Sequence, residues 1–347
     1  MPAPVFPPDR PATRMEPPAH LARSPRAAIR HRATGFPALV DALSDRWGLT
    51  PERVVVPGGR ASMVILVRTA DGTPGALKLH GRPERAGPEH AALRAWDGRG
   101  AVRSWRCDPR AGALLLERLR PAVSLRSLPE AKAVLETVSV GRRLWVEPEP
   151  GHPFPDVTAR SAAGARFLRW MVSSDAEGAG EADPFGDGPG NGRFPAPGPP
   201  GADPIACLPD PAALRPMIRE ALETRAELLA TAPAERLLLH GRLCQGTVLA
   251  SGTDRAPWLA VGPEPVVGER AWEVARVARD RPEDLMATSA GPVRIRRALA
   301  RLAETVEVDR ERLRGWTVFR AVESGVLRLT TGDRIGGETL LEFAARL

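Results

Sequence analysis

The sequence contains no tyrosine and only two lysines, Lys78 and Lys132, against 47 arginines. No apolar run reaches the roughly 18 residues that a membrane-spanning helix needs, so we expect no membrane partner. No apolar segment follows the first charges, as a secretory signal would require. The three cysteines, Cys107, Cys207 and Cys244, do not have metal-ligand spacing. We therefore expect free thiols in a reducing cytoplasm.

The net charge of +7 is unevenly distributed along the chain. Residues 1–35 carry six arginines against two acidic residues, whereas residues 36–347 carry 43 basic and 40 acidic residues. Eight prolines in the first 35 residues argue against a helix there, and we predict a disordered Arg/Pro-rich tail. Because the body is nearly balanced, a nucleic-acid partner is not favoured.

The apolar pattern divides the rest of the chain into a β-rich lobe at 36–120 and a mostly helical lobe at 121–347. The β-rich lobe is predicted to contain a helix at 36–47, strands at 54–56, 63–67 and 76–79, a helix from 88, and strands at 101–105 and 113–119. The helical lobe is predicted to contain helices at 130–145, 156–172, 211–230, 293–306 and 310–327. Residues 173–204 hold eight glycines and seven prolines, which predicts a disordered insertion.

The most informative stretch is residues 237–249, which read LLLHGRLCQGTVL and precede WLAVGPEP at 258–265. An apolar run enters a short polar loop, and two short β-rich segments follow. This layout resembles the catalytic loop and metal-binding strands of the aminoglycoside phosphotransferase family. It is most similar to the streptomycin and hydroxyurea branch, whose motifs read HGDLHxGNVL and IDPKP. The resemblance covers roughly residues 38–325 without the insertion.

The resemblance implies a two-lobed α+β fold of the protein-kinase-like type, with a small antiparallel sheet lobe and a mostly helical lobe. It also implies ATP as the cofactor. Gly58 and Gly59 would then form the turn over the ATP phosphates, because glycine lets backbone amides approach phosphate oxygens. Lys78 would reach the α and β phosphates from mid-strand, and Glu89 would hold Lys78 in position.

The family's reactive residues are missing from this frame. Its catalytic aspartate falls on Arg242, its metal-binding asparagine on Thr247 and its second metal-binding aspartate on Gly262. A guanidinium cannot accept a proton, because its pKa is above 12. Glycine offers a metal no side chain, and threonine offers only a hydroxyl. We therefore do not expect an ordinary Mg²⁺ site here.

Three alternatives remain for this loop. Glu264 could supply a displaced carboxylate for a metal, Arg242 could replace the metal's charge so that ATP binds without turnover, or Arg242 could pair with Glu264 or another acid and fill the site. Around it, Glu273 matches an acid that braces the family's loop. His240 is expected to pack and to hydrogen-bond the backbone, and Cys244 to be a buried thiol.

The resemblance implies an aminoglycoside/hydroxyurea phosphotransferase-like protein. The leading hypothesis is a pseudokinase that acts by binding a small-molecule ligand or a protein partner. The alternative is an active ATP-dependent phosphotransferase that uses relocated acidic residues to phosphorylate an alcohol group of an aminoglycoside-like molecule. Because fold alone does not establish activity, the arrangement of the site residues is needed to discriminate between the pseudokinase and the active phosphotransferase.

Overall fold

The computed structural model describes residues 15–24, 26–56, 58–59, 61–173, 203–287 and 291–347. The chain divides into two compact units. The first unit comprises Met1–Gly87 and Ser104–Arg118, and the second comprises Pro88–Arg103 and Leu119–Leu347. Each is described separately below. The predicted insertion falls almost entirely on residues 174–202, which lie outside the described residues.

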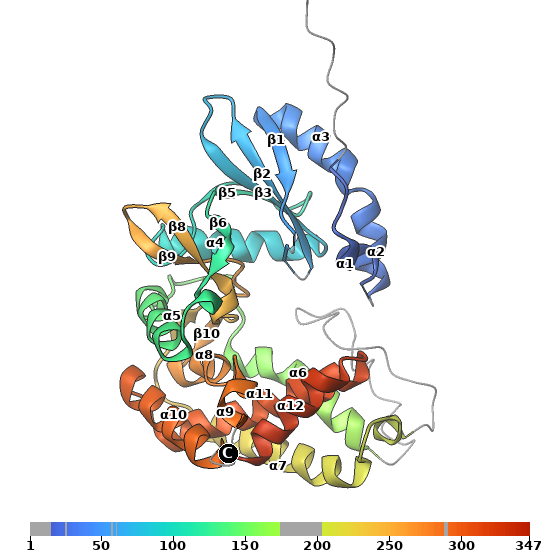
Figure 1. Cartoon of the computed structure of the whole chain (residues 1–347), viewed down its shortest axis with the longest axis vertical. Helices are drawn as coiled ribbons and strands as arrows, with labels where there is room; N and C mark the ends of the chain where they lie inside the picture. Colours follow the sequence, from blue (N-terminus) through green and yellow to red (C-terminus); the bar gives the residue numbers. More distant parts are fainter. Residues whose placement is uncertain (1–14, 25, 57, 60, 174–202, 288–290) are drawn as a thin grey trace, which may run out of the picture. The chain divides into compact units, whose positions relative to one another are not determined.

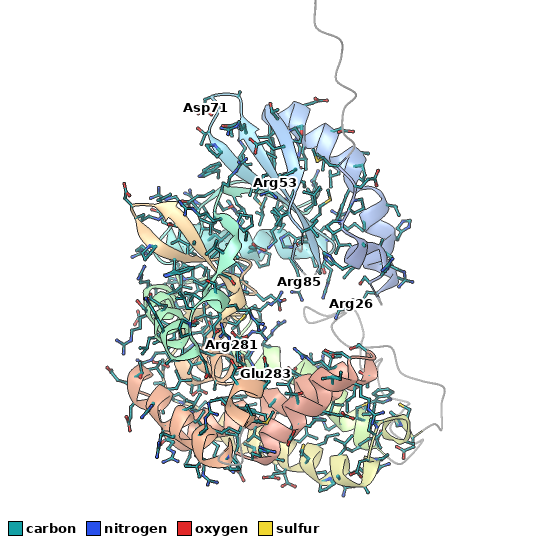
Figure 2. The ribbon with its side chains drawn as sticks, in the orientation of Figure 1. Arg26, Arg53, Asp71, Arg85, Arg281 and Glu283 are labelled. Atoms are coloured by element: carbon teal, nitrogen blue, oxygen red, sulfur yellow. The ribbon has the colours of Figure 1, made fainter. Side chains whose placement is uncertain are left out.

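The first unit is built on a five-stranded antiparallel sheet in the order β1-β2-β3-β5-β4. Its strands are β1 (Leu49–Val54), β2 (Ser62–Thr69), β3 (Pro74–His80), β4 (Ser104–Asp108) and β5 (Ala113–Glu117). A short 3₁₀ turn, η1 (Pro83–Arg85), follows β3. The β2–β3 hairpin turns at Asp71 (Figure 2), whose side chain accepts the N–H of Thr73 at 3.1 Å. The predicted sheet is thereby confirmed.

Three helices precede this sheet in the chain: α1 (Ala19–Ala22), α2 (Ala27–Thr34) and α3 (Phe36–Trp47) (Figure 1). The prediction of a disordered tail is wrong for α1 and α2, while residues 1–14 lie outside the described part. Leu21 and Ile29 are buried in the same core as the inner face of the sheet. Arg32 donates to the carbonyls of His80 at 2.7 Å and Ala111 at 2.5 Å. The Arg/Pro composition concealed these few apolar anchors.

The strand before the glycine turn also differs from its prediction. β1 begins at Leu49 and ends at Val54, so the apolar run 54–56 marks its end. Val55 still donates its N–H to Val64 at 2.8 Å, but Val56 is 71% exposed. Valine's strand preference is a matter of packing, and Val56 has little to pack against.

The second unit contains most of the helices. These are α4 (Ala86–Trp96, in this unit from Pro88), α5 (Glu130–Leu144), α6 (Val157–Val172), α7 (Pro211–Ala230), α8 (Arg270–Val277), α9 (Pro282–Met286), α10 (Gly291–Val306), α11 (Arg310–Thr330) and α12 (Arg334–Ala345). Short 3₁₀ turns lie at η2 (Leu125–Ser127), η4 (Pro204–Cys207) and η5 (Gln245–Thr247). Asp156 caps α6 by accepting the N–H of Ala159, at the start of the helix predicted at 156–172. None of the helices in the described ranges is long and apolar enough to cross a membrane.

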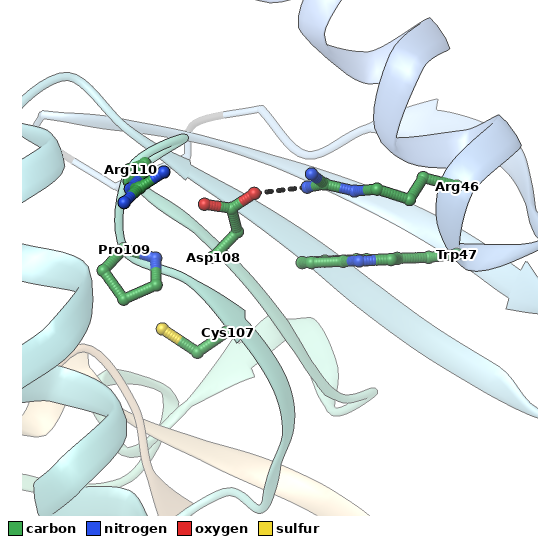
Figure 3. A pocket seen from close by; sticks show the side chains of 6 residues that line it. All are labelled: Arg46, Trp47, Cys107, Asp108, Pro109 and Arg110. Atoms are coloured by element: carbon green, nitrogen blue, oxygen red, sulfur yellow. Dashed lines mark hydrogen bonds and ion pairs between the residues drawn. The ribbon is translucent and has the colours of Figure 1, made fainter.

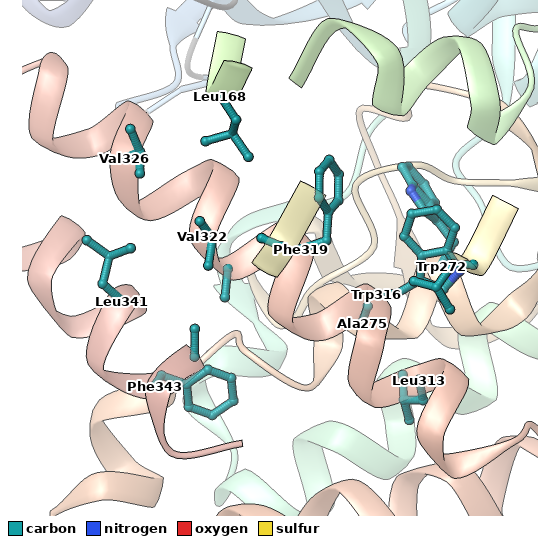
Figure 4. Close-up of a cluster of buried hydrophobic side chains, with 14 of the residues drawn as sticks. Leu168, Trp272, Ala275, Leu313, Trp316, Phe319, Val322, Val326, Leu341 and Phe343 are labelled. Carbon is teal, nitrogen blue, oxygen red and sulfur yellow. The ribbon is translucent and has the colours of Figure 1, made fainter. Parts of the chain in front are cut away.

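Helix α11 is the centre of the second unit's core (Figure 4). Its residues Trp316 and Phe319 are at most 1% exposed, and their rings meet edge to face with centroids 6.2 Å apart. Helices α6, α7, α8 and α12 all contact α11. Such a core fixes the position of α8, which carries residues that support the site.

Two small sheets complete the second unit. One joins β6 (Arg120–Ser124), β8 (Val248–Thr253) and β9 (Ala256–Ala260), and the other joins β7 (Leu237–Leu239) and β10 (Val266–Gly268). Residues 88–103 belong to this unit, not to the predicted β-rich lobe. One reason is Trp96, which is fully buried and donates its indole N–H to the carbonyl of Leu144 at 2.8 Å.

Candidate functional site

The loop between β7 and η5 begins with a tight turn at Gly241. This glycine has a φ of +75°, a region that residues with a side chain rarely adopt. A Cβ at this position would overlap the carbonyl oxygen of Glu264. Glu264 in turn donates its backbone N–H to the carbonyl of His240 at 2.9 Å. The loop and the segment after β9 therefore approach each other as closely as two backbones can.

The side chain of Glu273, on helix α8, supports this turn. It is fully buried, and its Oε2 accepts the N–H of Gly241 at 3.1 Å. Burial raises the pKa of the Glu273 carboxyl, and Arg320 together with the loop N–H groups offsets part of that shift. The expected bracing contact is present.

His240 is also fully buried and makes two backbone contacts. Its Nδ1 accepts the N–H of Arg242 at 3.2 Å, so its Nε2 carries the hydrogen that faces the carbonyl of Val261 at 3.2 Å. The imidazole stacks on Trp96 with ring centroids 6.2 Å apart. Burial, and then the charge of Arg242, lowers the pKa of His240 to about 3. The residue is a neutral structural element, as predicted.

Arg242 lies at the end of this turn and is paired with an acid. Its Nη1 is 3.2 Å from Oε1 of Glu264, and the other carboxylate oxygen of Glu264 contacts Nη2 of Arg160. The three side chains are 29%, 18% and 13% exposed, respectively. The Arg242–Glu264 pair anticipated from the sequence is therefore present. Arg160, on α6, had no sequence signal because it lies 104 residues from Glu264.

The other two positions do not offer a metal site either. The hydroxyl of Thr247 lies 2.9 Å from the carbonyl of Cys244 and 3.1 Å from that of Arg242, and it accepts the N–H of Cys244. This hydroxyl holds the loop closed. Gly262 has a φ of +66° and no side chain. In the described part of the chain, no three His, Cys, Asp or Glu residues gather as metal ligands. These residues do not fit Mg²⁺, which prefers carboxylate and carbonyl oxygens.

The rest of the loop rests on the end of α8. Cys244 is a buried thiol, as predicted, and its Sγ lies 3.9 Å from Nη2 of Arg276. The N–H of Gln245 donates to Asp280 at 2.8 Å, and Asp280 also pairs with Arg126 at 3.3 Å. The loop is thus held on several sides by side chains of its own unit.

The residues predicted to bind ATP fall in both units. Lys78 is 9% exposed in the middle of β3, between Val64 and Leu114 of the neighbouring strands. Glu89 is 2% exposed in the first turn of α4 and belongs to the second unit. Their pairing remains a prediction. Gly58 and Gly59 join β1 to β2, and the carbonyl of Gly59 lies 2.9 Å from the ring of His20.

A pocket lies in the first unit (Figure 3). It is lined by Arg46, Trp47, Cys107, Asp108, Pro109 and Arg110. Arg46 pairs with Asp108, and its guanidinium carbon lies 5.6 Å from the ring centroid of Trp47. None of the residues predicted for the site lines it.

The loop sequence and this fold lead to one family. A sequence profile described as aminoglycoside/hydroxyurea antibiotic resistance kinase matches residues 46–177 and 208–332. The chain belongs to this family. Streptomycin 6-kinase of Streptomyces glaucescens is 31% identical over 299 residues, covering 86% of this chain and 84% of the relative. Hydroxyurea phosphotransferase of Kitasatospora aureofaciens is 34% identical over 310 residues, covering 88% and 77%.

Solved structures agree on the fold. A thermostable mutant of aminoglycoside phosphotransferase APH(4)-Ia, in complex with ADP and hygromycin B, superposes with a TM-score of 0.54 at 14% identity, covering 88% of this chain and 96% of that one. Ethanolamine kinase of Plasmodium vivax superposes with a TM-score of 0.52 at 11% identity, covering 91% and 88%. The protein-kinase-like fold predicted from the sequence is confirmed.

The family motifs give the Arg242–Glu264 pair a further meaning. Where the kinase motifs read HGD and IDPKP, this chain reads HGR and VGPEP. The aspartate of the loop is replaced by Arg242, and the lysine of the following segment is replaced by Glu264. The two positions that carry opposite charges in the motifs therefore carry them here with the signs exchanged.

Proposed function

We propose that this chain is a non-catalytic member of the aminoglycoside/hydroxyurea kinase family, which binds a ligand at the Arg242 loop without transferring phosphate. The observation that carries the proposal is the pairing of Arg242 with Glu264 at the position where the motif has its catalytic aspartate. A cation there cannot accept the proton of an alcohol.

The size of the effect supports this proposal over the active alternative. Loss of a general base typically costs about 10²- to 10⁴-fold in rate. The charge stabilisation that a metal provides is commonly a still larger contribution. Relocated acids would have to replace both. Glu264 is the nearest candidate in sequence, but its two oxygens are engaged by Arg242 and Arg160.

The ligand class follows from the relatives. Their names give streptomycin and hydroxyurea as substrates of kinases. A relative of the same fold was solved with ADP and hygromycin B. We therefore propose a nucleotide or a small polar molecule of this kind as the ligand of this chain, with Lys78, Glu89, Gly58 and Gly59 as the predicted nucleotide contacts.

The test is a phosphotransfer assay with ATP, Mg²⁺ and either streptomycin or hydroxyurea. We expect no transfer by the wild-type chain under conditions where the Streptomyces glaucescens enzyme is active. A variant that carries Arg242→Asp, Thr247→Asn, Gly262→Asp and Glu264→Lys should gain at least about 10²-fold in ATP turnover, because it regains a base and metal ligands.

The matched control carries Arg242→Asn in place of Arg242→Asp and is otherwise the same. It restores the metal ligands without the base, so its turnover should stay near that of the wild type. Transfer by the wild-type chain at a rate comparable to the relative would overturn the proposal and establish the active alternative.

A further inference from the structure

Arginine side chains contact both carboxylate oxygens of Glu264. Arg160 and Arg242 each contact one of its carboxylate oxygens. Arg276 lies near enough for Glu264 to act on its pKa, which burial lowers and Cys244, Asp280 and Glu264 raise, with a net upward shift. Asp280, the other acid at this end of α8, already pairs with Arg126 and accepts the N–H of Gln245. One carboxylate thus faces several guanidinium groups.

The two arginines contact different oxygens of the same carboxylate. Oε1 of Glu264 faces Arg242, and Oε2 faces Arg160. The two arginines come from different elements, the loop after β7 and helix α6, and both contact this carboxylate. Guanidinium groups bind carboxylate and phosphate oxygens in the same forked manner. A phosphate group therefore offers these two arginines negatively charged acceptor oxygens, as Glu264 does.

The cluster is also open to exchange. Arg242 keeps 29% of its side-chain surface exposed and Glu264 keeps 18%. Water therefore reaches the Arg242–Glu264 pair, so an anion from solution can approach it. An anion that contacts both arginines compensates them for the loss of Glu264.

We infer that Arg160 and Arg242 form a Mg²⁺-independent site for a phosphate-bearing ligand, and that Glu264 is its built-in competitor. The inference rests on the proposed function and names the ligand chemistry of the same loop. In this account the two arginines neutralise the ligand's phosphate without a metal. Glu264 keeps the site closed until a phosphate displaces it.

The experiment is calorimetric titration in EDTA with inorganic phosphate, pyrophosphate and ATP as three separate probes. Glu264→Gln removes the competing charge at constant size, and we expect at least one probe to bind about tenfold tighter than to the wild type. Adding Arg160→Gln or Arg242→Gln to this variant should abolish the gain. The gain should also shrink at 1 M salt, where charges are screened within about 3 Å.

Two exposed residues of α10 provide matched controls. Glu304→Gln changes the net charge as Glu264→Gln does, and Arg294→Gln changes it as Arg242→Gln does. Neither should alter probe affinity by more than about twofold. A preference for ATP over pyrophosphate would identify a nucleotide as the ligand. Equal binding of all three probes would identify an isolated phosphate group.

The inference is overturned if Glu264→Gln binds none of the three probes more tightly than Glu304→Gln does while both remain folded by circular dichroism. Should Glu264→Gln fail to fold, Arg242→Gln in the wild-type background decides: it must weaken binding relative to Arg294→Gln. Mg²⁺-dependent phosphotransfer by the wild type would instead contradict the proposed function. The titrations in EDTA do not depend on that result, so the two tests can fail independently.

Discussion

At the scale of single residues, the loop has the backbone contacts that support its turn, but the charges at positions 242 and 264 are opposite to those in the family motifs. Gly241, His240 and Glu273 hold the turn through backbone contacts that need no reactive group. Arg242 and Glu264 form an ion pair at two positions where the family motifs have residues of the opposite charge. The backbone contacts that shape the turn therefore do not depend on the identity of the residue at position 242.

The burial of His240 in this loop should make the free energy of unfolding depend on pH. Its pKa is lowered to about 3 in the folded chain, first by burial and then by Arg242, against about 6.5 when unfolded. The unfolded chain thus takes up a proton below pH 6.5 that the folded chain refuses. His240 should consequently lower the free energy of unfolding by about 1.4 kcal/mol per pH unit from 6.5 down towards 3.

The direct measurement is an NMR titration of the His240 imidazole. We expect its chemical shift to stay constant from pH 8 to about 5 in the folded protein, while the same resonance in the urea-unfolded chain titrates near 6.5. A folded-state midpoint above pH 5 would show that water or an acid reaches the ring, and the loop would not be sealed as described.

Site residues could be predicted from the sequence where they lie close together along the chain. Arg242, Thr247 and Gly262 were identified because each stands at a defined place in a short motif. Arg160 was not, since α6 meets the loop only in the folded chain. Local patterns locate residues within one loop, whereas a contact across 104 residues depends on packing that no local pattern encodes.

At the scale of elements, the turn at Gly241 combines two constraints that can be measured apart. Its φ of +75° alone disfavours a side chain, and the carbonyl of Glu264 leaves no room for one. Gly72, in the β2–β3 hairpin, has a similar φ of +83° but nothing within 4 Å of a Cβ. The two glycines therefore form a matched pair.

We expect Gly72→Ala to cost about 1 kcal/mol, the strain of a left-handed residue. Gly241→Ala should cost more than about 3 kcal/mol, because the backbones of the loop and of residue 264 must also move apart. Urea denaturation of the two variants gives both values. Equal costs would mean that the close approach to Glu264 contributes nothing to the loop.

The helices before the sheet provide a second test at this scale. Ile29 of α2 is 1% exposed within the core of the first unit, so Ile29→Ala should lower the free energy of unfolding by about 2 to 4 kcal/mol. Val56→Ala, at a residue that is 71% exposed, should change it by less than about 0.5 kcal/mol. If urea denaturation gives the two variants the same stability, α2 is not part of this core.

Elements with a regular apolar period were predictable, and those with unusual composition were not. Helix α7 has the predicted bounds, 211–230, and α10 and α11 lie close to theirs. Helix α12 was missed because it contains Gly336 and Gly337, which are poor helix formers. A Cβ at Gly337 would lie 2.7 Å from Leu329, so this glycine serves the close packing of α12 on α11.

At the scale of the whole molecule, the chain has the family's fold, but its loop carries the positive charge of Arg242 where the family motif has an aspartate. The sequence predicted the fold well because sheet and helix patterns extend over many residues. The nucleotide contacts predicted from the sequence, Lys78, Glu89, Gly58 and Gly59, remain predictions. In the proposed site, Arg160 and Arg242 take the place of a metal at this loop.

Calorimetric titration of the wild-type chain with ATP, in Mg²⁺ and again in EDTA, is the most direct test of this replacement. We expect one affinity, unchanged within about twofold by Mg²⁺ and weakened about tenfold in Arg242→Gln. Binding that tightens strongly with Mg²⁺ and ignores Arg242→Gln would contradict it, because a metal would then hold the phosphates through residues other than those of this loop.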